Sequence, residues 1–109
     1  MKDHRLIDER SLAFDRLIAA KLLANPTLVE KARVNLSRWL ASAAPAVRTD
    51  LQEWQRLLDG PLETLLSILK SADQRATRLR QSSPFCGILT PAERTRILQE
   101  FEARESITA

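Results

Sequence analysis

Cysteine, histidine, glycine and aromatic residues are all scarce in this chain of 109 residues. The one cysteine, Cys86, and the one histidine, His4, are too few for an internal disulfide or a thiolate zinc site. Only two glycines occur, and no glycine-rich phosphate loop or glycine turn between strands is present. These absences exclude disulfide scaffolds and most metal and catalytic sites, and a lone cysteine fits a reducing compartment.

Long uncharged apolar stretches are also missing. No run approaches the roughly 18 apolar residues of a transmembrane helix, and charges interrupt the N-terminal segment where a signal peptide would be apolar. With 44% hydrophobic and 28% charged residues, the composition is that of an ordinary soluble domain. We therefore expect one cytoplasmic domain over residues 1–109 that contacts no membrane and needs no cofactor.

Apolar residues recur at spacings of three and four along most of the chain, a pattern typical of amphipathic helices. Pro26, Pro45 and Pro61 interrupt this pattern, because the residue before a proline is pushed out of the α region. Short connections favour antiparallel neighbours in a compact bundle. We expect an all-α, single-domain bundle of about six helices, near 6–24, 26–43, 46–59, 61–70, 72–81 and 91–105.

Two of these helices have a start signal in the sequence. Ser71 with Gln74, and Thr90 with Glu93, have the spacing of a capping box. In that motif the hydroxyl accepts a hydrogen bond from the backbone N–H three residues later, and the later side chain bonds back to the first residue. The sequence therefore predicts that helices open at both points.

The excess of basic residues lies in one short segment. The chain has a formal net charge of +3, and residues 70–83 hold Lys70, Arg75, Arg78 and Arg80 against the single acid Asp73. One interpretation is a solvated helix whose arginines pair with the acidic residues of the last helix. The other is a contact surface for an anionic partner, because a planar guanidinium binds carboxylate or phosphate bidentately.

Residues 81–89 do not fit a helical interpretation. Two serines, a proline and a glycine forbid a continuous helix, yet Phe85, Ile88 and Leu89 are large and apolar. These side chains either fasten the last helix to the core, or form with Ser82 and Ser83 a strip that inserts into a partner's cleft. The sequence leaves both alternatives open.

Groups suited to catalysis are few. Nucleophilic catalysis needs a nucleophile, a base and a group that orients the base, and the single imidazole, His4, lies close to the terminus, where solvation is the simpler interpretation. Cys86 would be reactive if a positive charge lowered its pKa, but a small buried residue is the favoured interpretation. No catalytic, cofactor-binding or metal-ligating residue is predicted, and the chain is not expected to be an enzyme.

Several motifs between residues 50 and 105 resemble those of a known group of proteins. The motifs are Glu53-Trp54-Gln55-Arg56-Leu57-Leu58-Asp59, Gly60-Pro61-Leu62, Arg78-Leu79-Arg80-Gln81-Ser82-Ser83-Pro84-Phe85, Gly87 and Thr90-Pro91-Ala92-Glu93-Arg94. In them the chain resembles small uncharacterised helical bacterial proteins associated with toxin–antitoxin-type operons, although Cys86 stands where alanine or glycine is expected. The resemblance implies an antitoxin that blocks a toxin enzyme by direct binding, and it carries over no catalytic residue.

The resulting hypothesis is a non-enzymatic protein-binding module that occludes a cognate toxin enzyme. The predicted contact residues are Arg75, Arg78, Leu79, Arg80, Ser82, Ser83, Phe85 and Ile88. One alternative is a DNA-binding or autoregulatory protein, whose affinity for nucleic acid would fall steeply with salt. Another is a homo-oligomeric structural module closed by the same loop.

Overall fold

Helices account for most of the described chain. The computed structural model describes the backbone of residues 4–108 and the side chains of residues 5–104, and within this part no strand occurs. The elements are α1 (His4–Ala24), the 3-10 turn η1 (Pro26–Leu28), α2 (Val29–Leu40), α3 (Pro45–Asp59), α4 (Leu62–Lys70), α5 (Gln74–Arg80) and α6 (Pro91–Thr108). The expected all-α, single-domain fold is confirmed.

Prolines and a capping box set several helix boundaries. Pro26 and Pro45 stand at the start of η1 and α3, where a missing N–H costs no hydrogen bond. α2 ends at Leu40 rather than at residue 43, since the chain must leave the α region ahead of Pro45. At the start of α6, the Glu93 N–H donates to Thr90 Oγ1 at 3.1 Å and the Thr90 N–H donates to Glu93 Oε1 at 2.7 Å. The capping box predicted there is confirmed.

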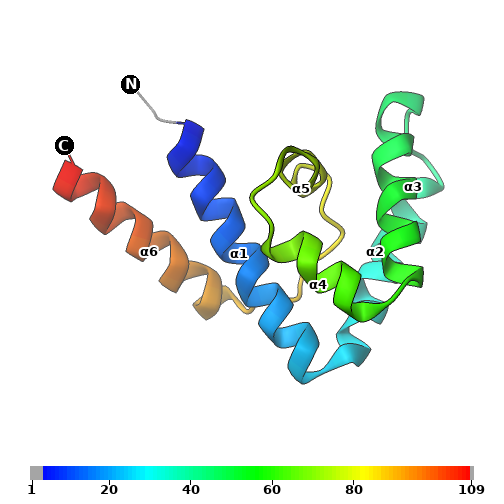
Figure 1. Ribbon diagram of the computed structural model, residues 1–109, viewed down its shortest axis with the longest axis horizontal. Coiled ribbons are helices and arrows are strands. Elements are labelled where there is room, and N and C mark those ends of the chain that lie inside the picture. The colour runs from blue at the N-terminus through cyan, green and yellow to red at the C-terminus, as the bar shows by residue number, and fades with distance from the viewer. Residues whose placement is uncertain (1–3, 109) are drawn as a thin grey trace.

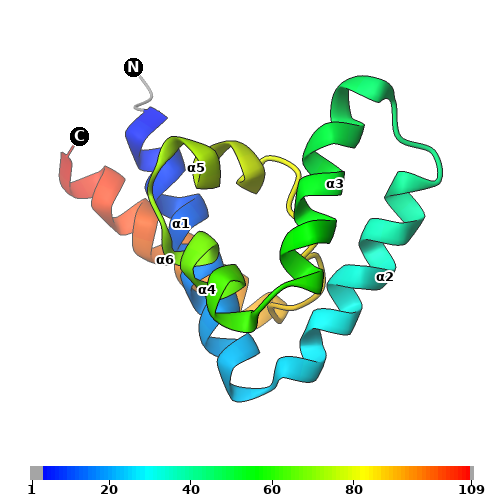
Figure 2. The ribbon, with the colours of Figure 1, turned by 45° about the vertical axis from the view of Figure 1, so that its right-hand side comes forward.

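The helices form two arms with α4 and α5 between them, as Figure 1 and Figure 2 show. α2 and α3 run antiparallel in one arm, as the short connection between them predicts. In the other arm α1 and α6 run antiparallel, and α1 also packs against α4. The molecule measures 43 × 32 × 23 Å along its principal axes. The segment from α5 to α6 thus lies between the arms and connects them.

The centre of the hydrophobic core is Trp54 of α3, which has no exposed surface. Its indole Nε1–H donates to the Leu79 carbonyl at 2.9 Å. Its ring meets Phe85 edge to face, with the centroids 5.6 Å apart and the planes at 80°. Burying a tryptophan of this size is worth several kcal/mol, about 3–5 by truncation to alanine in comparable cores. Residues 79–85 are therefore held against α3 by a buried aromatic pair and a buried hydrogen bond.

Candidate functional site

α5 carries the basic segment, and Asp73 fixes where it begins. The Asp73 carboxylate accepts a hydrogen bond from the Ala76 N–H at 2.8 Å, and this bond holds the pKa of Asp73 below its usual range. Ser71 Oγ accepts from the Asp73 N–H at 3.1 Å instead of capping the helix. The predicted Ser71–Gln74 capping box is therefore wrong, because Asp73 takes the N-cap position. The helix opens at Gln74 rather than at residue 72.

Two of the predicted contact residues, Arg75 and Arg78, are half-exposed and bond to α3. Arg75 Nε donates to Glu53 Oε2 at 2.6 Å, Arg78 Nη2 donates to Glu53 Oε1 at 3.0 Å, and Arg78 Nη1 donates to Asp50. These bonds, first that from Arg75, hold the pKa of Glu53 below its usual range. The acidic residues suggested as intramolecular partners lie on α6, which packs along α1 in the other arm (Figure 1). The intramolecular pairing is thus with α3.

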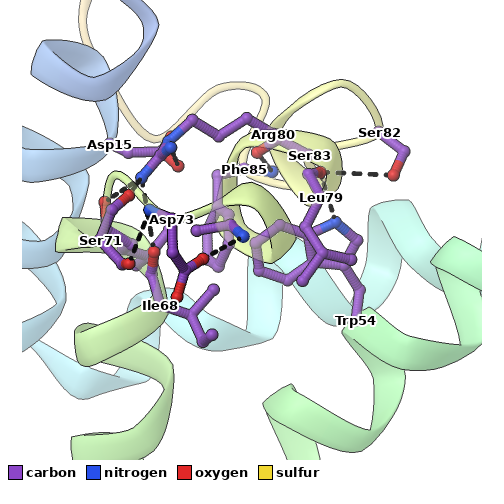
Figure 3. A network of polar contacts seen from close by, with 12 residues as sticks. Asp15, Trp54, Ile68, Ser71, Asp73, Leu79, Arg80, Ser82, Ser83 and Phe85 are labelled. Carbon is purple, nitrogen blue, oxygen red and sulfur yellow. Dashed lines mark hydrogen bonds and ion pairs between the residues drawn. The ribbon is translucent and has the colours of Figure 1, made fainter. Parts of the chain in front are cut away.

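Arg80 points inward, although it was predicted from the sequence to lie on a contact surface. Its Nε donates to Asp15 Oδ2 at 3.0 Å, and both side chains are only 7% exposed. Its Nη2 donates to the carbonyls of Leu69 at 3.2 Å and Ile68 at 3.5 Å and to that of Ser71, as Figure 3 shows. These carbonyls lie in the last turn of α4 and at its C-cap, Ser71, where helix carbonyls lack a partner further along the helix. Arg80 therefore ties α1, α4 and α5 together, and it does not belong to the exposed surface formed by Arg75 and Arg78.

Asp15 is a residue of this site that was not predicted from the sequence. It is a buried charged residue, and burial raises its pKa to about 6 against the opposing attraction of Arg80. Its position contained a signal, because Asp15 shares a helical face with the buried Ile18 and Leu22. A carboxylate within an apolar stripe requires a buried partner, and the basic segment supplies it.

The apolar residues predicted to enter a partner's cleft enter this protein's own core instead. Leu79, Phe85 and Ile88 are 0%, 3% and 4% exposed. Ser82 and Ser83 are half-buried, and Ser83 Oγ accepts a hydrogen bond from the Phe85 N–H at 3.3 Å. Residues 81–89 were predicted either to fasten the last helix to the core or to insert into a partner's cleft. The structure shows the first of these alternatives. The other would require these side chains to leave the core.

A tight turn at the tip of the loop brings Cys86 to the surface. The Ile88 N–H donates to the Phe85 carbonyl at 3.3 Å, so Cys86 and Gly87 are the central residues of the turn. Gly87 has φ = +85°, as the second central residue of a type II turn requires. Cys86 is exposed, and the interpretation of a small buried residue was wrong. The turn directs Phe85 and Ile88 inward and leaves the residues between them outside.

Asn35 of α2, in the arm formed by α2 and α3, holds this turn in place. Its side-chain Nδ2 donates to the Pro84 carbonyl at 2.9 Å and to the Cys86 carbonyl at 3.1 Å. A single amide thereby fixes the path of the loop through two backbone groups. Nothing in the local sequence near Asn35 indicated this role, because the bonded carbonyls belong to a distant segment.

A cleft of about 210 Å³ opens beside the turn, between α1, the loop and the start of α6. The charged residues of its lining are the buried Asp15 and Arg80 and the exposed Arg94, whose guanidinium lies 4.9 Å from the centroid of the Phe14 ring. Phe14 and Phe85 are among its apolar walls, and the exposed Cys86 also lines it. The cleft thus combines a buried ion pair, aromatic surface and an accessible thiol. Such a combination suits recognition of a small group that is partly polar and partly apolar.

In the part of the chain that the structure describes, no group of three or more His, Cys, Asp and Glu side chains is placed to hold a metal ion. Among the described helices none is long and apolar enough to cross a membrane. Comparison with protein-family models, with curated proteins and with solved structures finds no match to this chain. Arg75 and Arg78 of α5 and the Asp15–Arg80 cleft are the candidate recognition features.

Proposed function

We propose that this chain is a non-enzymatic binding module that inhibits a partner enzyme by covering its functional surface, as antitoxins do. The observation that carries the proposal is the free end of Arg75. Its Nε is bonded to Glu53, whereas among the described residues neither of its Nη groups has a hydrogen-bond partner. The paired Nη groups are the edge of a guanidinium that accommodates a carboxylate or phosphate end-on. The proposed contact surface is therefore Arg75 together with Arg78.

The arginines are also ordered before any partner arrives. Arg78 bridges Asp50 and Glu53, and a side chain already held in one geometry loses less conformational entropy on binding. Exposed ion pairs contribute little to stability, about 0–1 kcal/mol each, so a partner carboxylate can replace Asp50 at small cost. We infer that the partner presents carboxylates to this surface.

The resemblance described above supports one kind of partner. Toxin–antitoxin-type operons encode an enzyme beside its inhibitor, so we propose a cognate toxin enzyme as the partner. Cys86 is exposed and forms no disulfide, which fits a reducing cytoplasm as the place of the complex.

The proposal can be tested by capture of the partner with matched arginine variants. The tagged chain and an Arg75→Gln/Arg78→Gln variant are incubated with an extract of the source cells at moderate salt, and bound proteins are quantified by mass spectrometry. Glutamine removes the guanidinium without placing a new charge beside Glu53. The control is Arg96→Gln, because Arg96 is exposed on α6, with only a 4.0 Å contact to Glu100. Melting temperatures show whether the variants remain folded.

We expect one stoichiometric enzyme to bind the original chain and the Arg96 variant, and to be lost from the double variant. Equal capture by all three chains would contradict the proposed surface. Recovery of nuclease-sensitive DNA would favour the DNA-binding alternative, and recovery of the bait alone with a doubled mass in light scattering would favour the homo-oligomer. Both of these outcomes contradict the inhibitor.

A further inference from the structure

We propose that the cleft beside Asp15 and Arg80 binds a neutral carboxamide. Both side chains line the cleft and are more than nine-tenths buried, and they share one hydrogen bond, from Nε to Oδ2. Within the described residues, Asp15 Oδ1 accepts no hydrogen bond and Arg80 Nη1 donates none, and neither atom is sealed from solvent. Two residues that line one cleft thus retain an unused acceptor and an unused donor.

The charge of the pair selects a neutral ligand. At the buried pair, an anionic ligand would be attracted by Arg80 but repelled by Asp15 at similar range, and a cationic ligand would meet the opposite combination. Arg94, the third charged residue of the lining, is exposed, so solvent screens its charge. A carboxamide carries no net charge and has an acceptor and a donor side by side. Its carbonyl oxygen can accept from Arg80 Nη1 while its NH₂ group donates to Asp15 Oδ1, and each bond has one charged partner.

The walls of the cleft indicate what the amide is attached to. Phe14, Ile18, Phe85 and Leu89 contribute apolar surface beside the ion pair. A cavity of about 150 Å³ is sufficient for benzene in an apolar protein core. The cleft here measures about 210 Å³, so it has room for a ring or a short aliphatic chain together with one amide group. Its ligand is therefore a small apolar group that ends in a carboxamide.

Two sources can supply such a group, the amide side chain of a bound protein or a free small molecule. The inference does not require the α5 surface proposed above, because the cleft residues differ from Arg75 and Arg78. Its test therefore uses defined probes and no partner protein.

The natural cysteine provides the test by disulfide tethering. Three aminoethanethiol probes that end in benzamide, benzoate or benzene are offered as capped disulfides. The Cys86 thiolate attacks the probe disulfide, forms a mixed disulfide and releases the capping thiol. Intact-protein mass spectrometry then gives the labelled fraction at increasing reductant concentration. Because the amide gains hydrogen bonds to two charged groups, we expect the benzamide adduct to tolerate about tenfold more reductant than either other adduct.

Two variants separate cleft binding from ordinary thiol reactivity. In Cys86→Ser/Ser42→Cys the thiol is moved to the exposed turn after α2, and the preference for benzamide should disappear. Ser11→Leu fills part of the cleft without changing Asp15 or Arg80, and it should also abolish the preference at an unchanged melting temperature. Equal labelling by all three probes in the original chain would overturn the proposal.

The benzamide-labelled protein then distinguishes the two sources of amide. If the label prevents capture of the partner protein while the benzene label does not, the amide belongs to the partner's side chain. If capture is unchanged, the ligand is a free small amide. Should no partner be captured at all, the proposed function fails, whereas the tethering result on the cleft still stands.

Discussion

Replacing Asp15 with asparagine should remove most of the pH dependence of stability between pH 8 and pH 5. Burial raises the pKa of Asp15 to about 6 from an ordinary value of 3.8, so the folded chain holds this proton more tightly than the unfolded chain. The stability that protonation contributes is fully present below about pH 4 and is lost as the pH rises through 6. It amounts to about 3 kcal/mol in total, of which about 1.4 kcal/mol is gained on going from pH 8 to pH 5.

Other perturbed carboxyls act mainly outside this window. Hydrogen bonds from Arg75 and Lys21, respectively, hold the pKa values of Glu53 and Glu93 below the ordinary 4.5. Their contributions to stability are present above that value and are lost as the pH falls through their lower folded pKa values. Between pH 8 and pH 5 they change little, so Asp15 dominates the expected slope.

The assay is urea unfolding followed by tryptophan fluorescence at the two pH values. For a chain of this size, a change of 1.4 kcal/mol moves the urea midpoint by about 1 M. We expect the original chain to gain this amount at pH 5 and Asp15→Asn to gain little. The variant will be less stable overall, because Arg80 loses its counter-ion, so the readout is the slope with pH. Asp8→Asn, on the exposed face of α1, should keep the slope of the original chain.

If the urea midpoint shifts equally between pH 8 and pH 5 in the original chain and in Asp15→Asn, this reasoning is refuted. That result would mean that Arg80 stabilises the Asp15 carboxylate enough to offset its burial. The carboxyl would then have an ordinary pKa in the folded chain, and the buried pair would contribute no pH dependence above pH 5.

Three substitutions test local structure by the same urea assay. Thr90→Ala removes one half of the capping box and should lower the free energy of unfolding by about 1 kcal/mol; an unchanged midpoint would show that Glu93 alone suffices. Gly87→Ala should cost about 1 kcal/mol although no atom lies within 4 Å of the new Cβ, since φ is +85°; a neutral effect would argue against the type II turn. Trp54→Phe loses the bond to the Leu79 carbonyl and leaves a cavity, and should cost about 2 kcal/mol; a loss below 0.5 kcal/mol would contradict the central packing described for this ring.

The helices were predictable because their signals are local. Pro26 and Pro45 act on their immediate neighbours, and Thr90 bonds to a residue within the same turn. Where the local interpretation failed, a neighbouring group competed successfully. At the start of α5, Asp73 supplies a carboxylate for the N-cap where Ser71 would supply a hydroxyl.

The candidate site was only partly predictable, since its decisive contacts join distant segments. The composition of residues 70–83 identified Arg75 and Arg78 as exposed basic residues, but no local pattern separates them from Arg80. That difference arises because Asp15 of α1 faces Arg80. Likewise, the burial of Phe85 is decided by its contact with Trp54. An apolar loop residue has the same local sequence whether it packs against its own core or against a partner.

The way in which Asn35 holds the loop has a consequence for sequence variation. Its amide bonds to the carbonyls of Pro84 and Cys86, and every residue type has a backbone carbonyl. The outward side chain at position 86 can therefore change from one related chain to another without altering the path of the backbone. Gly87 is the exception, because its positive φ ties that position to glycine. Such a loop can acquire a new binding preference by single substitutions at its tip while the fold beneath it stays constant.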